Sequence, residues 1–210
     1  DGTDISKNWD TEFHKPHKAQ LDADFTEALE QSSTITPQVL VNTVRKAVPD
    51  DGVVTLDNGM YKLYFARHFE ARFENTLLLD NALATMGAGV PSAIATKLIH
   101  PDKKVVAVAG DGGFMMNSQE LETAVRLKLD LVIIILNDQA FQMIRWKQTN
   151  EGFDEFGMTF NNPDFVAYAE SYGAHGHRAT TPAELSELLT SSLTAKGVHV
   201  IDAHIDYSKN

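Results

Sequence analysis

Short aliphatic runs alternate along this chain with segments of helical apolar period, and this alternation constrains the fold more than any other feature. We expect strands at residues 53–57, 76–80, 104–109, 131–137, 177–179 and 198–205. Helical patterns separate most of them, at residues 61–69, 86–98, 118–128, 141–148, 163–172 and 182–195. Buried strands that alternate with amphipathic helices are typical of a parallel sheet with both faces covered. The sequence therefore predicts an α/β fold with a doubly wound, mainly parallel six-stranded sheet and helices on both faces.

The first 35 residues differ from the rest because they contain few aliphatic side chains. We interpret residues 1–35 as a linker or arm from a missing upstream domain, with one short helix around residues 25–31. A second interpretation is that this segment packs on such a neighbouring domain. Thr36 followed by Pro37 is a favourable helix start, so residues 36–210 are expected to form the folded domain. The chain begins with Asp rather than Met, from which we expect a fragment of a longer protein.

Composition argues against several classes of function. The chain has 18 Lys and Arg against 29 Asp and Glu, a net charge of −11, whereas nucleic acid binding needs a basic face. The absence of cysteine excludes disulfides, Cys-ligated zinc, iron–sulfur clusters and cysteine nucleophiles. The longest aliphatic run, residues 131–136, is far shorter than the ~20 residues that span a bilayer. We expect no membrane segment, and without a signal peptide the expected location is the cytoplasm.

The segments that follow two of the predicted strands are candidates for a ligand site, because ligands in open α/β sheets bind at the carboxyl ends of the strands. One strand ends in the Gly-Asp-Gly-Gly run of residues 110–113, and another ends in Asn137-Asp138. A G-x-G-x-x-G dinucleotide loop fails because its third glycine position is Met115, and Asp111 would repel a pyrophosphate placed directly on the loop. A Mg²⁺ ion removes this objection, since it prefers carboxylates, carbonyls, waters and substrate phosphates. We therefore interpret the site as Mg²⁺ plus a diphosphate.

The same residues also have a purely structural explanation. Gly-Asp-Gly-Gly is a good turn and Asn-Asp is a good start of a loop, and each alone is more often only that. Asp111 and Asp138 are 27 residues apart, which leaves room for a helix and the next strand. If the two strands are neighbours, both carboxylates lie at one edge of the sheet, so the spacing favours the metal site.

These motifs resemble those of a known family. The stretch that begins with Gly110-Asp111-Gly112, continues through residues 117–124 and ends in Asn137-Asp138 is similar to the thiamine-diphosphate motif, GDG followed by NN or ND. Residues 84–91 are similar to the segment that supports the central bend of the thiamine. Over residues 37–210 the chain resembles the acetolactate (acetohydroxyacid) synthases. The resemblance implies the thiamine-diphosphate-binding fold, and within it the C-terminal diphosphate-binding domain of the catalytic subunit.

The resemblance also implies a role for each matching position. Asp111 and Asp138 would be side-chain ligands of Mg²⁺, and Ala140 would add a backbone carbonyl. The amides of Gly112 and Gly113 would bind the diphosphate. The remaining cofactor-binding positions are Gly110 in the same loop, Asn58 near the diphosphate, Met86 under the bend of the cofactor, and Ala84, whose carbonyl would accept from the aminopyrimidine.

The chain departs from the common family pattern in three respects. Asp138 stands where many members have Asn, a variant typical of the catabolic acetolactate synthases. Met60 and Tyr61 stand where relatives place Gln, Ser or His near the diphosphate, so contacts there are expected to be weak. Trp146 lies one residue before the Trp position of the biosynthetic enzymes, at Lys147. One residue is a turn of about 100° on a helix, which argues against a role in selecting 2-ketobutyrate.

The function implied by the resemblance is the cofactor-binding part of an enzyme that decarboxylates pyruvate and condenses it with a second pyruvate to 2-acetolactate. No catalytic residue is assigned, because the family's activating glutamate lies in a separate pyrimidine-binding domain. We therefore expect the fragment to be inactive alone, and the full-length chain to form a dimer or tetramer through that domain. The resemblance leaves FAD open as a further cofactor of the full-length chain.

Several alternatives stay open at this point. They are another 2-keto-acid decarboxylase or carboligase such as glyoxylate carboligase, a pyruvate oxidase, a sulfoacetaldehyde acetyltransferase, and a non-catalytic module that binds thiamine diphosphate or metal. A nicotinamide-binding domain is disfavoured by Asp111 and by the failed third glycine.

Other chemically interesting residues have simpler explanations. Four histidines suggest a metal cluster, but no HExxH spacing exists among them, so exposed or hydrogen-bonded histidines are expected: His175, His177, His199 and His204. Three basic residues are expected at solvated helix positions: Arg126, Arg145 and Lys147. An apolar loop would either cover the substrate or, as we favour, pack on a neighbouring domain: Phe153, Phe156, Met158 and Phe160.

Overall fold

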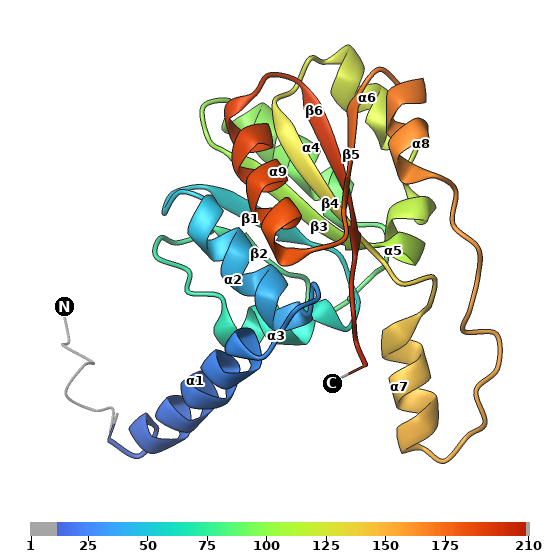
Figure 1. The fold of residues 1–210 in the computed structure, drawn as a ribbon. Coiled ribbons are helices and arrows are strands. Elements are labelled where there is room, and N and C mark those ends of the chain that lie inside the picture. Colours follow the sequence, from blue (N-terminus) through green and yellow to red (C-terminus); the bar gives the residue numbers. More distant parts are fainter. Residues whose placement is uncertain (1–11, 209–210) are drawn as a thin grey trace. The chain divides into compact units, whose positions relative to one another are not determined.

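A six-stranded sheet, in which every neighbouring pair of strands is parallel, forms the centre of the protein (Figure 1). The structure is a computed structural model, and it describes residues 12–208. The strand order is β2-β1-β3-β4-β6-β5. The strands are β1 (Val53–Leu56), β2 (Leu77–Leu78), β3 (Val105–Gly110), β4 (Leu131–Asn137), β5 (His175–Ala179) and β6 (Val198–His204). The described chain divides into two compact units, one up to Ser32 and one from Ser33 onward, and the sheet belongs to the second.

Helices cover both faces of this sheet. Side chains such as Ala107, Ile133 and Val200 form a core on one face. The helices that complete this core are α4 (Gly89–Ile99), α5 (Asp111–Met116), α6 (Glu120–Arg126) and α8 (Phe165–Ser171). The opposite face is covered by α9 (Pro182–Thr194) and, packed beside it, α2 (Pro37–Ala47) (Figure 1). The predicted doubly wound α/β fold is confirmed.

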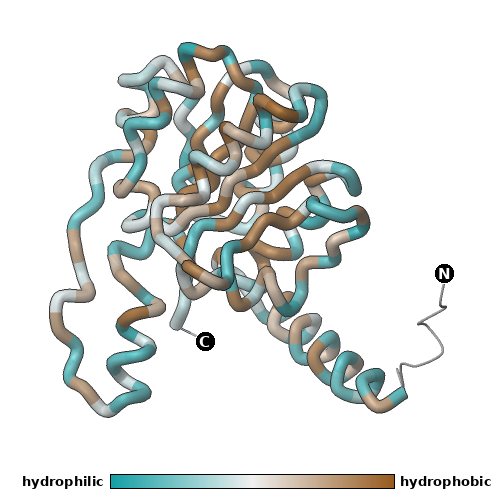
Figure 2. The backbone as a smooth tube through the Cα atoms, turned by 180° about the vertical axis from the view of Figure 1, so that it is seen from behind, coloured by the Kyte–Doolittle hydropathy of each residue, from teal (hydrophilic) through white to brown (hydrophobic). Residues whose placement is uncertain are grey.

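The central strands follow the predicted aliphatic runs because they are buried from both sides. All residues of β1, and all but the last of β3 and β4, are buried. Figure 2 shows the hydrophobic residues concentrated along these strands. The edge strands fit the prediction less well, since β2 is only Leu77–Leu78 within the expected 76–80, and β5 begins at His175, two residues early. An edge strand pairs on one side only, so aliphatic content says less about its extent.

The first unit contains one helix, α1 (Lys15–Glu30), which is longer than the helix expected at residues 25–31. None of its residues is buried, and before Phe25 it contains one large aliphatic side chain, Leu21, so its first turns carry little apolar signal. Its side chains pair along its surface instead, for example Gln20 Nε2 with Asp24 Oδ1 at 2.7 Å. The first 11 residues of the predicted arm lie outside the described part of the chain. Within residues 12–208, neither α1 nor any other helix has the length and apolarity that crossing a membrane requires.

The order of the strands determines where a ligand can enter. From β1 the chain passes through α3 (Tyr61–His68) to β2 on one side, and then through α4 to β3 on the other side. The connections that leave β1 and β3 therefore diverge, which makes a crevice at the carboxyl ends of these strands, the usual place for ligands in such sheets. The loop after β1, the Gly-Asp-Gly-Gly run and the Asn137-Asp138 exit all lie at this edge.

Three histidines stack at the opposite, amino end of β5 and β6. His177 Nε2 lies 3.0 Å from His199 Nδ1, and the two rings are parallel within 4°. His175 stacks on His199 at 4.6 Å between ring centroids. Because His199 Nε2 must donate to the carbonyl of Lys196 at 3.1 Å, the neutral ring accepts at Nδ1 from His177. Among the described residues no group of three or more His, Cys, Asp or Glu side chains is arranged to hold a metal ion, and His177 and His199 are hydrogen-bonded.

We expect this histidine stack to destabilise the protein in mild acid. Burial and, second, the nearby His175 lower the pKa of His177. Burial, together with the nearby His175 and His177, also lowers the pKa of His199. Unfolded histidine titrates near pH ~6.5. Because the pKa values in the folded protein are lower, the contribution of these histidines to stability is fully present above pH ~6.5 and is lost progressively as the pH falls below that value. The melting temperature should therefore fall more between about pH 7.5 and about pH 5.5 in the wild type than in His177→Gln, which keeps an amide donor without titrating.

The comparison between the two proteins is what tests this expectation, since other groups titrate in the same range and affect both equally. Thermal unfolding followed by circular dichroism at several pH values, without metal or cofactor, gives both profiles. Parallel profiles in wild type and His177→Gln would mean that the stack has no part in the acid response.

Candidate cofactor site

A pocket of about 410 Å³ opens at the carboxyl ends of β1, β3 and β4. Eight of the predicted site residues line it: Asn58, Met86, Gly110, Asp111, Gly112, Gly113, Asp138 and Ala140. Ala84, the ninth, is exposed on its loop and is not part of the lining. The fold therefore brings predicted residues from four separate segments of the chain to one place. Their binding roles remain predictions.

Asp111 is the most strongly held side chain of the pocket. It begins α5 directly after β3, and only 1% of its surface is exposed. Its Oδ1 accepts from the amide of Gly112 at 2.7 Å, and its Oδ2 accepts from the amides of Asp138 at 3.2 Å and Gln139 at 2.7 Å. The side chain of Asn162 donates a further bond to Oδ2 at 2.7 Å. Burial raises the pKa of Asp111, and these four donors oppose that shift.

Asp138 lies beside Asp111 because β3 and β4 are neighbours, with Gly110 paired to Leu136 in the sheet. Burial and, second, the charge of Asp111 raise the pKa of Asp138 to about 7. Its Oδ2 is buried, and within the described chain it has no hydrogen-bond partner. The buried carboxylate of Asp111 and the buried, unpaired Oδ2 of Asp138 form a site that a cation would stabilise.

The residues after Asp138 adopt an unusual backbone. Gln139 has a φ of +58°, in the left-handed region that side chains other than glycine rarely occupy. A short bridge with the returning loop holds it there, since Phe160 donates to the carbonyl of Gln139 at 3.1 Å and Phe141 donates to Met158 at 2.9 Å. The bridge does not use the carbonyl of Ala140, the predicted third ligand. Strained backbone of this kind concentrates at functional sites.

Both glycines after Asp111 are needed for packing as well as for any ligand. A Cβ atom on Gly112 would lie 2.4 Å from the ring of Phe141, and one on Gly113 would lie 3.0 Å from Oδ2 of Asp57. Phe141 in turn packs on Phe160 with 4.6 Å between the ring centroids. The close approach of these neighbours explains why the loop is rich in glycine.

Asp57, at the end of β1, is a site residue that sequence reasoning missed. It is 1% exposed and accepts at 2.9 Å from the amide of Gly87 with both of its oxygens, and from Asn58 N–H at 2.6 Å. Asn117 holds the same segment from the other side, donating to the carbonyl of Gly87 at 2.8 Å. Together they fix the loop that carries Met86. The available signal was that β1, β3 and β4 each end in, or are directly followed by, Asp or Asn: Asp57, Asp111 and Asn137.

Tyr61 takes the place of the polar residue expected near the diphosphate. Its side chain is 2% exposed, and its hydroxyl accepts from the amide of Gly110 at 3.0 Å. Burial, and second the charge of Asp57, raise its pKa well above the usual value, so the hydroxyl stays protonated. The Gly110 amide is therefore already engaged.

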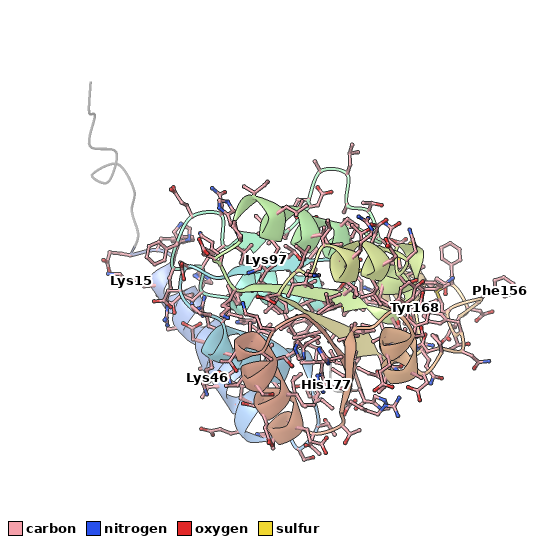
Figure 3. The ribbon with its side chains drawn as sticks, turned by 90° about the horizontal axis from the view of Figure 1, so that it is seen from above. Lys15, Lys46, Lys97, Phe156, Tyr168 and His177 are labelled. Atoms are coloured by element: carbon pink, nitrogen blue, oxygen red, sulfur yellow. The ribbon has the colours of Figure 1, made fainter. Side chains whose placement is uncertain are left out.

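A second pocket of about 960 Å³ adjoins the first, and its walls are α3, α7 (Gln142–Asn150) and Tyr207. Arg145 lines it, which corrects the expectation that this residue is solvated. The loop after α7 returns over Arg145, which is 27% exposed and pairs with Glu155 at 2.8 Å. Arg126 is solvated as expected, in an exposed pair with Glu122. At the outer end of this loop Phe156 is 84% exposed and points away from the sheet (Figure 3).

The chain is similar to known proteins over most of its length. The family described as "Thiamine pyrophosphate enzyme, C-terminal TPP binding domain" matches residues 57–203. Acetolactate synthase of Bacillus subtilis (strain 168) is 39% identical over 180 residues, which are 86% of this chain and 32% of that protein. The catabolic acetolactate synthase of Raoultella terrigena is 33% identical over 174 residues, 83% of this chain and 31% of that protein.

A solved structure shares the fold. The thiamine diphosphate-dependent 4-hydroxybenzoylformate decarboxylase of Rhodococcus jostii RHA1 aligns with a TM-score of 0.79 and 24% identity, over 85% of this chain and 34% of that one. The chain thus spans about a third of the length of the relatives that it matches. The predicted resemblance and the predicted cofactor, thiamine diphosphate, are confirmed. The chain belongs to the family of thiamine pyrophosphate enzymes, whose C-terminal TPP-binding domain it contains.

Proposed function

We propose that this chain binds the diphosphate end of thiamine diphosphate through Mg²⁺, and that the complete protein condenses two molecules of pyruvate to 2-acetolactate and CO₂. One observation supports the binding role above all others. The buried Oδ2 of Asp138 has no partner within the described chain and lies in a pocket with the buried carboxylate of Asp111.

The donor set fits a magnesium ion and a diphosphate. Mg²⁺ keeps several waters and takes one or two carboxylates together with substrate phosphates, so two aspartates suffice. Asp111 and Asp138 would hold the ion, and the carbonyl of Ala140 is a candidate for a further bond. Asn58 and Gly113 line the same pocket and would contact the diphosphate.

The cofactor, when bound, supplies a carbanion and an electron sink for the decarboxylation of a 2-keto acid. The residues of this chain provide the binding and the orientation. Asp57 and Asn117 hold the loop of Met86 in place from two sides, which would let the Met86 side chain support the bend of the cofactor. Phe141 and Phe160 close the pocket beside Gly112 and would help to exclude water.

The choice of pyruvate as both donor and acceptor is supported by the names of the relatives, which are acetolactate synthases. The activating glutamate of the proposed mechanism would come from a pyrimidine-binding domain, in a dimer or tetramer. The 210-residue chain alone is therefore expected to turn over no pyruvate.

The proposal is tested with the complete protein, Mg²⁺, thiamine diphosphate and pyruvate, with the products resolved by chromatography. We expect acetolactate, which is converted to acetoin by acid treatment, and no product when Mg²⁺ is removed by EDTA. Acetaldehyde or acetyl phosphate as the main product would contradict the carboligase assignment and leave the cofactor site intact. The absence of turnover with any 2-keto acid would instead favour a non-catalytic binding module.

A further inference from the structure

We propose that Asn162 is a positioning residue that determines which oxygen of Asp111 faces the metal. The inference rests on the proposed function, because it concerns the same Mg²⁺ site. Asn162 lies in the loop between α7 and α8, 51 residues from Asp111 along the chain, and its side chain is partly buried. Nothing in the sequence motifs points to it.

The argument begins with the hydrogen bonds of Asp111. Its Oδ2 accepts three, from the amides of Asp138 and Gln139 and from Asn162 Nδ2, whereas its Oδ1 accepts one, from the amide of Gly112. A carboxylate oxygen offers about two lone-pair sites. The bond from the Asp138 amide is long, at 3.2 Å, so the 2.7 Å bond from Asn162 completes the engagement of Oδ2. Oδ1 is then the oxygen that keeps a site for a cation.

The amide of Asn162 can perform this role in one orientation only. Its Nδ2 donates to Asp111 Oδ2 at 2.7 Å and also to Asn137 Oδ1 at 2.9 Å. A flipped amide would place an oxygen against the Asp111 carboxylate and lose both bonds. The Oδ1 of Asn162 is buried and, among the described residues, has no donor. The unsatisfied acceptor costs free energy, and the two donated bonds offset that cost.

A chain of hydrogen bonds across three strands keeps Asn162 in this orientation. Asn137, at the end of β4, donates to Asp202 Oδ1 of β6 at 2.9 Å, and Arg178 of β5 donates to Asp202 Oδ2 at 3.0 Å. The Asp202 side chain is 2% exposed, so its carboxylate is shielded from water. Arg178 also binds Asp164, two residues after Asn162, at 2.8 Å. Asp111 and Asp202, the carboxylates at the two ends of this series of hydrogen bonds, can only accept. The side-chain amides of Asn162 and Asn137 must therefore turn their NH₂ groups toward them.

A positioning role and a merely structural role predict different results. If Asn162 only anchored its loop, its loss would lower the melting temperature and leave the metal affinity of the folded protein unchanged. If it orients Asp111, its loss must weaken metal binding in protein that is still folded. Groups that orient metal ligands typically contribute 10- to 100-fold to metal affinity.

The experiment uses the complete protein with thiamine diphosphate and Mn²⁺, a paramagnetic substitute for Mg²⁺ whose free concentration is measured by electron paramagnetic resonance. Asn162→Asp keeps the shape of the side chain, removes both donors and adds a charge. We expect its dissociation constant for Mn²⁺ to rise by about 10- to 100-fold. Asn161→Asp makes the same chemical change at the exposed neighbouring position and is expected to stay within about twofold of the wild type.

If Asn162→Asp does not fold, Asn162→Ala decides the question, since it removes the donors without adding charge. We expect this variant to lose about tenfold in affinity for Mn²⁺. Wild-type affinity in a folded Asn162 variant overturns the inference, even with a lowered melting temperature. An equal loss in Asn161→Asp overturns it as well, because charge alone would then explain the effect. If the wild type binds no Mn²⁺ with thiamine diphosphate, the proposed function fails and this inference with it, so the two failures are distinguishable.

Discussion

Asp111→Ala is expected to abolish the Mg²⁺-dependent binding of thiamine diphosphate, with an affinity loss of about 100-fold or more. Groups that merely orient a metal ligand contribute 10- to 100-fold, and Asp111 is proposed as a ligand itself. The substitution also removes the acceptor of four hydrogen bonds, including those from the amides of Asp138 and Gln139. Isothermal titration of the complete protein with thiamine diphosphate, with Mg²⁺ and with EDTA, measures the effect directly.

Two further variants make this result specific. Asp138→Asn should be milder, about tenfold, because an amide oxygen can still coordinate the ion and the repulsion from Asp111 disappears. Asp102→Ala removes an exposed carboxylate after α4 and should bind the cofactor as the wild type does. Wild-type affinity in Asp111→Ala would refute the metal site at this edge of the sheet.

The second large effect is on stability. Asp57→Ala is expected to lower the free energy of unfolding by about 3 kcal/mol, because it leaves the buried amide of Gly87 and the partly buried amide of Asn58 without their acceptor, at about 1–3 kcal/mol for each unsatisfied group. Part of this cost is offset, since burial raises the pKa of Asp57 and its charge is itself expensive to bury. Urea unfolding of the protein without cofactor, followed by circular dichroism, measures the change.

The matched variants separate charge from shape. Asp57→Asn keeps the volume and one acceptor oxygen, and should lose about half as much stability. Asp51→Ala, in the exposed turn before β1, should stay within about 0.5 kcal/mol of the wild type. A loss of less than about 1 kcal/mol in Asp57→Ala would show that water satisfies the freed amides and that Asp57 does not fix the Met86 loop.

The central sheet, and the two site segments that follow β3 and β4, were predictable because buried parallel strands are continuous aliphatic runs. Val105–Gly110 and Leu131–Asn137 carry that signal, and the neighbouring positions of their ends bring Asp111 and Asp138 together. Asp57 gave no such signal, since a single aspartate after a strand usually only begins a loop. The role of Asn162 was harder still to predict, because it depends on a loop that returns to the end of β4, and no spacing rule describes that return.

The exposed parts of the chain were the least predictable. α1 has no buried residue, so local ion pairs rather than an apolar face accompany its helical structure, and the predicted helix was too short. Arg145 looked solvated because a charged side chain on a short helix is usually exposed, yet the returning loop pairs it with Glu155. In both cases the local structure depends on contacts that the spacing of hydrophobic residues in the sequence does not reveal.

The double hydrogen bond between Gly87 and Asp57 has a practical use. The Gly87 amide, in a backbone with a φ of +88°, donates to both oxygens of one buried carboxylate, so its proton should exchange with deuterium only when the loop lifts away from β1. A single nuclear magnetic resonance signal would then report how often the support of the cofactor opens. Saturation with thiamine diphosphate should slow that exchange, which provides a readout of loop ordering independent of any chemical turnover.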